Sequence, residues 1–353
     1  MFAYAARRLL IMIPTLVLIT LVVFLVVKLA PGNPFSVDQA SSSGAAGKMD
    51  PVDYEALLQR YGLDRPWYVQ YWRWLSSAAT GSFGDSFSER RPVTEVFFGA
   101  PLKAYGGEGG FFAKTGDAFG RFLGSKLGAT LLLNLLALFF MVIIAVPIGF
   151  RAAVKQGGWF DRVSGVVLYM LYSLPNFWVA VLLIILVGVQ WKLLPFTGMH
   201  SDGYEAMGAA AKFADLLRHA LLPAICLAYG SLAFIARFTR SSLLEVIRQD
   251  YVRTARAKGL PERTVLYRHA LRNALIPLLT LAGILVPTLV SGSIIIEQIF
   301  AWPGLGQLYI KAIATRDYPV IMANAFLGAV VVLVTTLLTD LSYALADPRV
   351  RYE

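Results

Sequence analysis

The chain has 353 residues, of which 57% are hydrophobic and only 15% are charged, whereas about 25% of the residues of a soluble domain are charged. This shortage of polar residues excludes an ordinary soluble protein and predicts an integral membrane protein. A single cysteine, Cys226, excludes an intrachain disulfide. The formal net charge of +10 fits either a nucleic-acid partner or a membrane topology, and the positions of the basic residues decide between the two.

Six apolar runs are long enough to cross a bilayer, which takes about 20 helical residues. The first run follows Arg7 and Arg8 as in a signal peptide, but it is too long for one and no small-residue cleavage site follows it. We therefore predict an all-α integral membrane protein with six transmembrane helices. The predicted spans cover residues 9–29, 127–150, 163–189, 220–236, 275–296 and 320–345. The chain then divides into the N-terminus and first span (1–29), an extracytoplasmic loop (30–126) and a five-span core (127–353).

The basic residues between these spans are unevenly distributed. With the N-terminus inside, the inner segments hold 16 Lys and Arg and the short outer loops hold 5, while the 30–126 loop is too long for the rule to apply. The basic excess therefore belongs to the inner face. We predict that both termini are cytoplasmic and that nucleic acid is not a partner.

The long first loop contains two predicted short helices. Asp50 as N-cap, Pro51 at the first position and Gly62 after the end delimit one of them. The stretch "DRPWYVQYWRWL" forms the other and places Trp67, Tyr71 and Trp74 on one face. Such an aromatic stripe is typical of packing or, at a membrane edge, of interfacial anchoring. We predict a helix lying on the outer surface, with ligand stacking as the less favoured alternative. The Gly-rich residues 99–120 predict a loop.

Motifs for catalysis are missing from the sequence. It contains no G-x-x-x-x-G-K-[ST] for nucleotide phosphates, no H-E-x-x-H and no G-x-S-x-G. We therefore expect no enzymatic activity, no metal site and no cofactor bound by this chain.

Polar residues deep in the predicted spans are few and uncharged. An ion-coupled carrier usually needs ionisable groups at mid-depth, whereas Lys28, Glu297 and Asp340 fall near span ends. Uncharged residues suit a hydrogen-bonding substrate pathway, although each could equally bond a neighbouring helix. The candidate pathway residues are Asn134, Tyr172, Asn176, Ser291, Ser293 and Asn324.

A polar, basic block at residues 240–276 separates the fourth and fifth spans. Read as one helix, its first part puts Leu244, Ile247, Tyr251 and Ala255 on a single stripe. Gly259 suits the left-handed position that ends a helix. Pro261 and Glu262 then suit the first turn of a second helix, which runs to Pro277. The block is too polar for the bilayer, so it forms a helix-turn-helix on the inner face, with anionic lipid as an alternative contact for its arginines.

This block resembles the cytoplasmic coupling loop of binding-protein-dependent ABC importers, in the oligopeptide/dipeptide permease family. Further matches lie in family order along nearly the whole chain. They are "RRLLIMIPTLVLIT", "LAPGNP", "YGLDRPWYVQYWRWL", "GSFGDSF", "SLPNFWVA", "DYVRTARAKG", "RHALRNALIP", "IIIEQIFAWPGLGQL", "RDYP" and "DLSYALADPRVRY".

The resemblance implies the fold of a type I ABC importer permease, the "B"-type subunit, in the bacterial inner membrane. It implies a second, related permease subunit forming a heterodimer, two cytosolic ATPase subunits that use ATP and Mg²⁺, an extracytoplasmic binding protein, and contact with membrane lipid. The residues implied in coupling to an ATPase are Glu245, Asp250, Tyr251, Arg253, Thr254, Ala255, Arg256, Ala257, Lys258, Gly259, Arg268, His269 and Asn273, with Ala255 expected on the docked face.

Two departures from the family pattern affect this interpretation. The family's Glu-Ala-Ala reads Arg253-Thr254-Ala255, and residues 99–128 look like an insertion. The expected cargo is peptide, the alternatives being a nickel chelate, glutathione or an oligosaccharide. A self-sufficient channel or ion-coupled carrier is the alternative from another class.

Overall fold

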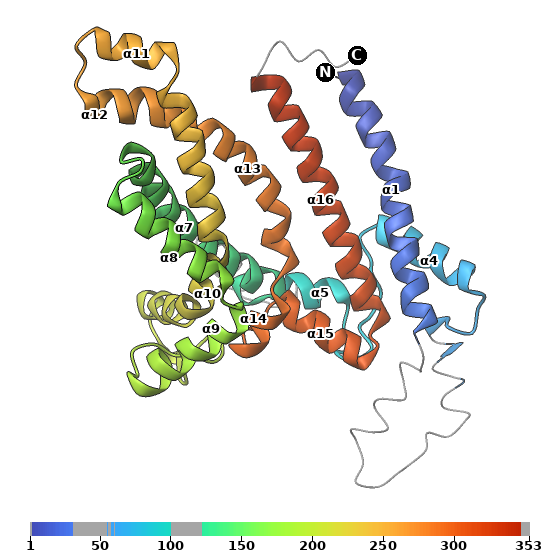
Figure 1. The fold of residues 1–353 in the computed structure, drawn as a ribbon. Helices are drawn as coiled ribbons and strands as arrows, with labels where there is room; N and C mark the ends of the chain where they lie inside the picture. The colour runs from blue at the N-terminus through green and yellow to red at the C-terminus, as the bar shows by residue number, and fades with distance from the viewer. Residues whose placement is uncertain (1, 31–54, 56–57, 60, 100–121, 347–353) are drawn as a thin grey trace. The chain divides into compact units, whose positions relative to one another are not determined.

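The computed structural model describes residues 2–30, 55, 58–59, 61–99 and 122–346. By its internal contacts the chain forms two compact units, one comprising Met1–Ala129 with Gly304–Glu353 and the other Thr130–Pro303. The elements described in both are helical, and the predicted all-α class is confirmed (Figure 1).

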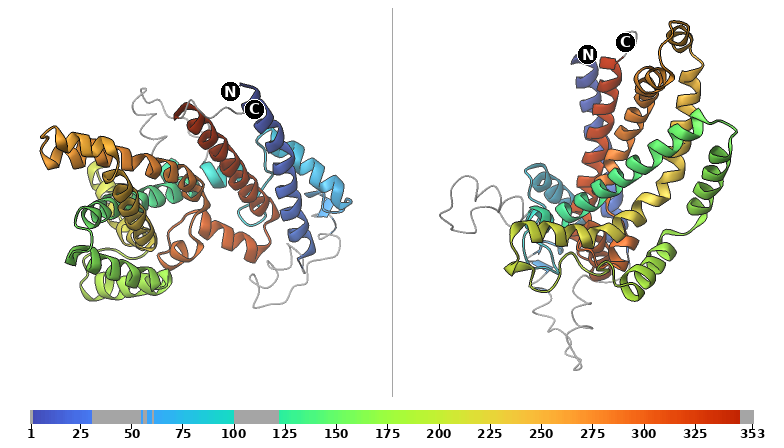
Figure 2. Two further views of the ribbon diagram at one scale, coloured as in Figure 1. Left: turned by 45° about the horizontal axis from the view of Figure 1, so that its top comes forward. Right: turned by 90° about the vertical axis from the view of Figure 1, so that its left-hand side faces the viewer.

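In the first unit, helix α1 (Phe2–Leu29) and helix α16 (Tyr318–Ala346) lie side by side and antiparallel (Figure 2). The shorter helices of this unit are α4 (Trp67–Ala79), α5 (Val93–Phe98) and α15 (Leu305–Thr315). The buried carboxylate of Asp317 joins the segment before α5 to the start of α16, because its Oδ2 accepts hydrogen bonds from Ser86 Oγ at 2.6 Å and from Ser88 Oγ at 2.8 Å.

The second unit contains the remaining helices, with α7 starting just before it. Buried side chains of α7, α8 and α10 form its largest described hydrophobic cluster, which includes Met141, Leu168 and Leu232. The elements are α7 (Lys126–Val154), α8 (Trp159–Ser173), α9 (Asn176–Leu183), a π-helical turn (Ile184–Gln190), a 3-10 turn (Tyr204–Ala206), α10 (Ala209–Ile247), α11 (Asp250–Ala257), α12 (Glu262–Thr264), a π-helical turn (Val265–Leu271), α13 (Arg272–Ser291) and α14 (Ile294–Ile299).

Among the described residues, four helices are long and apolar enough to cross a membrane, and five if one bent pair counts as a single span. They cover five of the six predicted spans. The predicted fifth span, 275–296, falls on α13, and the side chains of residues 278–284 lie outside the described part, so the count of six stays a prediction. Helix α13 ends at Ser291, before the predicted boundary, because Gly292 has a φ of 69° and redirects the chain into α14. The helices long enough to span are Arg7–Leu29, Lys126–Val154, Ala209–Ile247 and Tyr318–Leu338.

The predicted third span, 163–189, is wrong as one continuous helix. The chain bends by 95° between α8 and the helix that begins at Asn176. Pro175 offers no N–H to continue α8 and keeps the preceding residue out of the helical region. Leu174 accordingly has the extended angles φ −80° and ψ 129°.

The predicted fourth span, 220–236, is much shorter than the helix that contains it. Helix α10 has 39 residues. The hydropathy pattern marked only its apolar middle, because polar residues such as Lys212 and Arg240 continue the same helix at both ends.

The aromatic stripe on α4 packs against helices of its own unit, which confirms packing for two of its three residues. The Tyr71 hydroxyl donates to the Val17 carbonyl of α1 at 2.8 Å, and Trp74 contacts the Phe326 ring of α16 with ring centroids 6.1 Å apart. Trp67 is exposed. Gly62 has the expected left-handed φ of 65°, while Asp50 and Pro51 lie outside the described residues, as do 100–121 of the Gly-rich loop.

Candidate functional site

Helix α11, within the basic block, is separated from α10 by a break at Arg248 and Gln249. Gln249 has extended angles, φ −69° and ψ 148°, and α11 starts at Asp250. The single continuous helix predicted here is therefore wrong. The break lets Val252 and Ala255 pack on Val265, in a small buried cluster that a straight continuation of α10 would not form.

The turn after α11 has the predicted geometry. Gly259 has a φ of 76°, and its N–H donates to the Arg256 carbonyl at 2.9 Å. Pro261 precedes the next helix, whose segments α12, the π-helical turn and α13 follow one another without interruption past Pro277. Both predictions, the glycine end and the proline start, are confirmed.

Two polar contacts hold the helix pair together. Arg256 donates to both carboxylate oxygens of Glu262, at 3.1 and 2.7 Å. The Asn273 amide donates to the Tyr251 hydroxyl at 2.8 Å and so joins α11 to α13. These four polar residues therefore stabilise the shape of the helix pair.

The residues singled out for coupling are mostly on the surface, with one correction. Ala255 is only 6% exposed and packs inside the helix pair, so it is not on an outward docking face. His269 is half-buried. The exposed members are Glu245, Asp250, Tyr251, Arg253, Thr254, Arg256, Ala257, Lys258, Gly259, Arg268 and Asn273.

The ion pair of Glu262 with Arg256 makes the stability of the loop depend on pH. The neighbouring Arg256 guanidinium holds the pKa of the Glu262 carboxyl below its ordinary value of 4.5. A lowered carboxyl pKa adds stability above the unfolded-state pKa, and this is lost as the pH falls through the lowered value. Because both side chains are largely exposed, at 39% and 55%, we expect less than about 0.5 kcal/mol. The free energy of unfolding of wild type should exceed that of Glu262→Gln at about pH 6, and the difference should shrink as the pH falls below the ordinary carboxyl pKa of 4.5; a constant difference would contradict this.

Three candidate pathway residues line one cavity of about 220 Å³ in the second unit, between α7, α10 and α13. They are Asn134, Ser291 and Ser293. The Asn134 amide donates to the Leu289 carbonyl at 2.8 Å, near the end of α13, where carbonyls lack helical partners. The Ser291 hydroxyl donates within its own helix, to Thr288 at 3.1 Å. Asn134 therefore combines a helix-packing bond with a position on a cavity wall, whereas Ser291 bonds only within its own helix.

A second, more aromatic cavity of about 650 Å³ lies between α8 and α10. Tyr172 lines it, and the Arg237 guanidinium carbon lies 4.7 Å from the Tyr169 ring centre. Ser231 lines both cavities. Asn176 lies beside the same stretch, since a Cβ added at Gly230 would be 3.2 Å from its amide oxygen. Asn324 belongs to the first unit.

The sequence reasoning missed the stretch Tyr229-Gly230-Ser231 in the middle of α10. The Tyr229 hydroxyl donates to the Leu174 carbonyl at 2.8 Å, just beyond the end of α8 at Ser173. The sequence did contain a signal for this site, because these three polar or small residues interrupt an apolar run.

Tyr229→Phe should destabilise the second unit by about 1 kcal/mol, because the Leu174 carbonyl loses its buried partner. Thermal unfolding of the purified protein measures this. Tyr172→Phe removes a hydroxyl from an exposed side chain and should leave the unfolding temperature unchanged. If both substitutions changed the unfolding temperature equally, the Tyr229 hydrogen bond would not stabilise the bend between α8 and α9.

The described residues outside the gaps contain no group of three or more His, Cys, Asp or Glu that could hold a metal ion. Helices long and apolar enough to span a membrane, together with an exposed basic loop, fit the class of membrane transport subunits.

Comparison with known proteins identifies the family. The model of binding-protein-dependent transport system inner membrane components matches residues 145–352, and its N-terminal companion matches 1–98. The chain belongs to this family of ABC-importer permeases, in its oligopeptide/dipeptide permease branch.

Three relatives match this chain over their full length. The chain is 36% identical to the oligopeptide transport system permease protein AppB of Bacillus subtilis and 37% identical to the dipeptide transport system permease protein DppB of Escherichia coli, with 100% of each chain covered. The di/tripeptide transport system permease protein DppB of Pseudomonas aeruginosa is also 37% identical, with the same coverage. Among solved structures, an inward-facing MetNI methionine ABC transporter matches with a TM-score of 0.47 and 20% identity, over 63% of this chain and 94% of that chain.

Proposed function

We propose that this chain forms half of the translocation pathway of an ATP-driven importer of oligopeptides or dipeptides. The observation that carries the proposal is the identity of 36–37% over the full length of relatives that are named as peptide permeases. Two cavities are both lined by Ser231 and by further uncharged polar side chains, which supports a pathway that binds cargo by hydrogen bonds.

The energy enters through the helix pair at residues 240–276. Its exposed residues, among them Arg253, Thr254 and Ala257, dock on a cytosolic ATPase subunit. The contacts of Arg256 with Glu262 and of Tyr251 with Asn273 stiffen the pair, and its second helix continues into α13. Movement of a docked ATPase is therefore transmitted directly to a helix that borders the smaller cavity.

The complete transporter contains further subunits. Two ATPase subunits bind ATP and Mg²⁺, a second, related permease completes the pathway, and an extracytoplasmic binding protein delivers the peptide. Residues 30–126 form the extracytoplasmic loop, and the insertion at 99–128 begins within it.

Reconstitution of the complex in proteoliposomes tests the function. We expect uptake of labelled di- and oligopeptides that requires ATP, the binding protein and both permeases. Uptake by this chain alone, without ATP, would instead identify a channel or carrier. ATP-dependent uptake of a nickel chelate, glutathione or an oligosaccharide in place of peptides would keep the class and change the cargo.

Cysteine labelling tests the orientation, in which both termini and the 240–276 block are cytoplasmic. Native Cys226 is fully buried, so its background reactivity is low. In intact cells an impermeant thiol reagent should modify cysteine at the exposed Ser76 of α4. It should modify cysteine at the exposed Gln156, between α7 and α8 on the predicted inner face, only after permeabilisation. The reverse pattern would invert the topology.

A further inference from the structure

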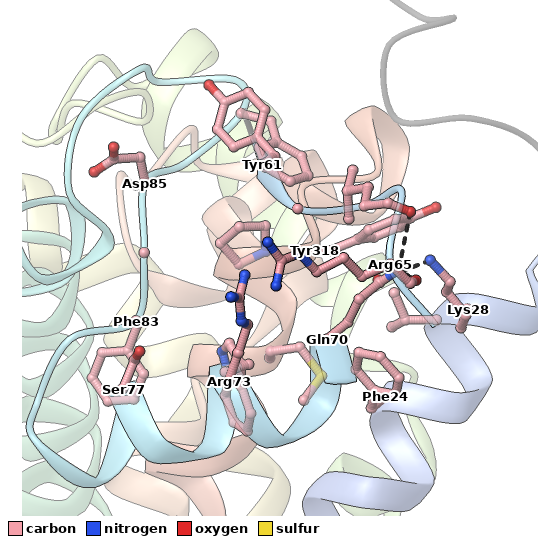
Figure 3. Close-up of a pocket in the computed structure, with 18 of the residues that line it drawn as sticks. Phe24, Lys28, Tyr61, Arg65, Gln70, Arg73, Ser77, Phe83, Asp85 and Tyr318 are labelled. Atoms are coloured by element: carbon pink, nitrogen blue, oxygen red, sulfur yellow. Dashed lines mark hydrogen bonds between the residues drawn. The ribbon is translucent and has the colours of Figure 1, made fainter. Parts of the chain in front are cut away.

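A cavity of about 570 Å³ lies within the first unit, at the C-terminal end of α1 (Figure 3). The end of α1, the middle of α4, the segment 82–87 and the first turn of α16 enclose it. None of the residues discussed above for coupling or for the pathway lines it.

Two guanidinium groups occupy the middle of this cavity. Figure 3 shows the side chains of Arg65 and Arg73 extending toward one another, and neither forms an ion pair within the described residues. Two like charges held together favour an anion between them, and guanidinium groups match the oxygens of a phosphate or carboxylate.

The rest of the polar wall is ordered around these arginines. The Lys28 ammonium donates to the Gln70 amide oxygen at 2.9 Å, and the Gln70 amide nitrogen donates to the Arg65 carbonyl at 2.6 Å. Asp64 and Asp85 also line the cavity, and Figure 3 shows Asp85 pointing away from the guanidinium groups. Three basic and two acidic side chains leave the lining with one excess positive charge.

The opposite wall is apolar and belongs to membrane-spanning helices. Phe24 and Val27 of α1 and Met322 of α16 contribute to it. Further along α1, Val22 and Val26 are 51% and 63% exposed, which gives an acyl chain an apolar surface to follow. On α4, Trp67, Tyr68 and Trp72 are 50–60% exposed, and Trp and Tyr concentrate at the boundary between hydrocarbon and headgroups.

We propose that this cavity binds the headgroup of an anionic phospholipid. The phosphate accepts hydrogen bonds from Arg65 and Arg73, and the acyl chains lie along α1. The single excess positive charge favours lipids that carry a net negative charge. It disfavours zwitterionic lipids, because their headgroup ammonium would face the arginines.

Native mass spectrometry of the delipidated full-length chain in detergent tests the site, with phosphatidylglycerol and phosphatidylethanolamine of identical acyl chains as probes. We expect tighter binding of phosphatidylglycerol. The double substitution Arg65→Gln with Arg73→Gln should weaken that binding about tenfold or more and leave the ethanolamine lipid unaffected. Arg65→Lys with Arg73→Lys should keep most of the selectivity, and Arg90→Gln, at an exposed arginine outside the cavity, should match wild type.

Several results would overturn the proposal. Equal affinity for the two lipids would remove the charge selection, and unchanged binding in the double Gln variant, with its melting temperature preserved, would place the lipid elsewhere. Loss of binding in the Arg90 variant would indicate a general charge effect. Displacement of the lipid by inorganic phosphate would assign the site to free phosphate, and displacement by an acidic peptide would assign it to a protein or peptide ligand.

Discussion

Ala255→Asp is expected to abolish co-purification of the ATPase and peptide uptake, although the permease still inserts. Ala255 is 6% exposed and contacts the fully buried Val252 and Val265. A carboxylate there has no partner and loses its hydration, at a cost of several kcal/mol. The helix pair then opens, and the surface proposed to dock on the ATPase loses its shape.

Ala257→Asp is the matched control for folding of the helix pair, because it adds the same charge to an exposed position of the same helix, on the proposed docking surface. This variant should keep the helix pair folded. Limited trypsin digestion measures the difference, since cleavage after Arg256 and Lys258 should become faster only in the Ala255 variant. Similar cleavage rates and wild-type uptake for Ala255→Asp would refute both the burial of this side chain and its role in shaping the loop.

Gly149→Ala is expected to destabilise the second unit by about 2 kcal/mol, within the usual range for overpacking. A Cβ at this position would lie 2.3 Å from the Ala236 carbonyl oxygen and 2.7 Å from the Thr239 Cβ. Because the Ala236 carbonyl oxygen belongs to the backbone and cannot rotate away, α7 and α10 must separate to admit a single methyl group. Because both helices carry the main hydrophobic cluster, the separation also disturbs the contacts around Met141 and Leu232.

Gly165→Ala provides the comparison for this substitution. Gly165 is also inside a helix, α8, but no atom lies within 4 Å of an added Cβ. Its replacement should change stability by less than about 1 kcal/mol, with a gain expected from helix propensity. The unfolding temperatures of both variants, measured in the same detergent, test this difference. A Gly149 variant as stable as the Gly165 variant would exclude the close approach of α7 and α10.

Local features of the sequence predicted much of the fold. The apolar runs located the long helices, because a membrane span must be apolar over a length fixed by the bilayer. Gly259 and Pro261 marked the turn of the coupling block for equally local reasons, since one tolerates a positive φ and the other suits a first turn. Pro175 carried a similar signal for the bend between α8 and α9, and the hydropathy of the surrounding residues concealed it.

The sequence by itself thus determined the membrane class, the family pattern and the turn at Gly259 and Pro261. The tertiary structure alone decided which side chains face inward. Ala255 shares its type and its helix with Ala257, yet only Ala255 is buried, because the break at Gln249 turns that face toward Val265. The pairing of Tyr229 with the Leu174 carbonyl and of Asn134 with Leu289 joins positions far apart in the chain. Such contacts depend on how helices pack, and periodicity within one helix carries no information about its neighbour.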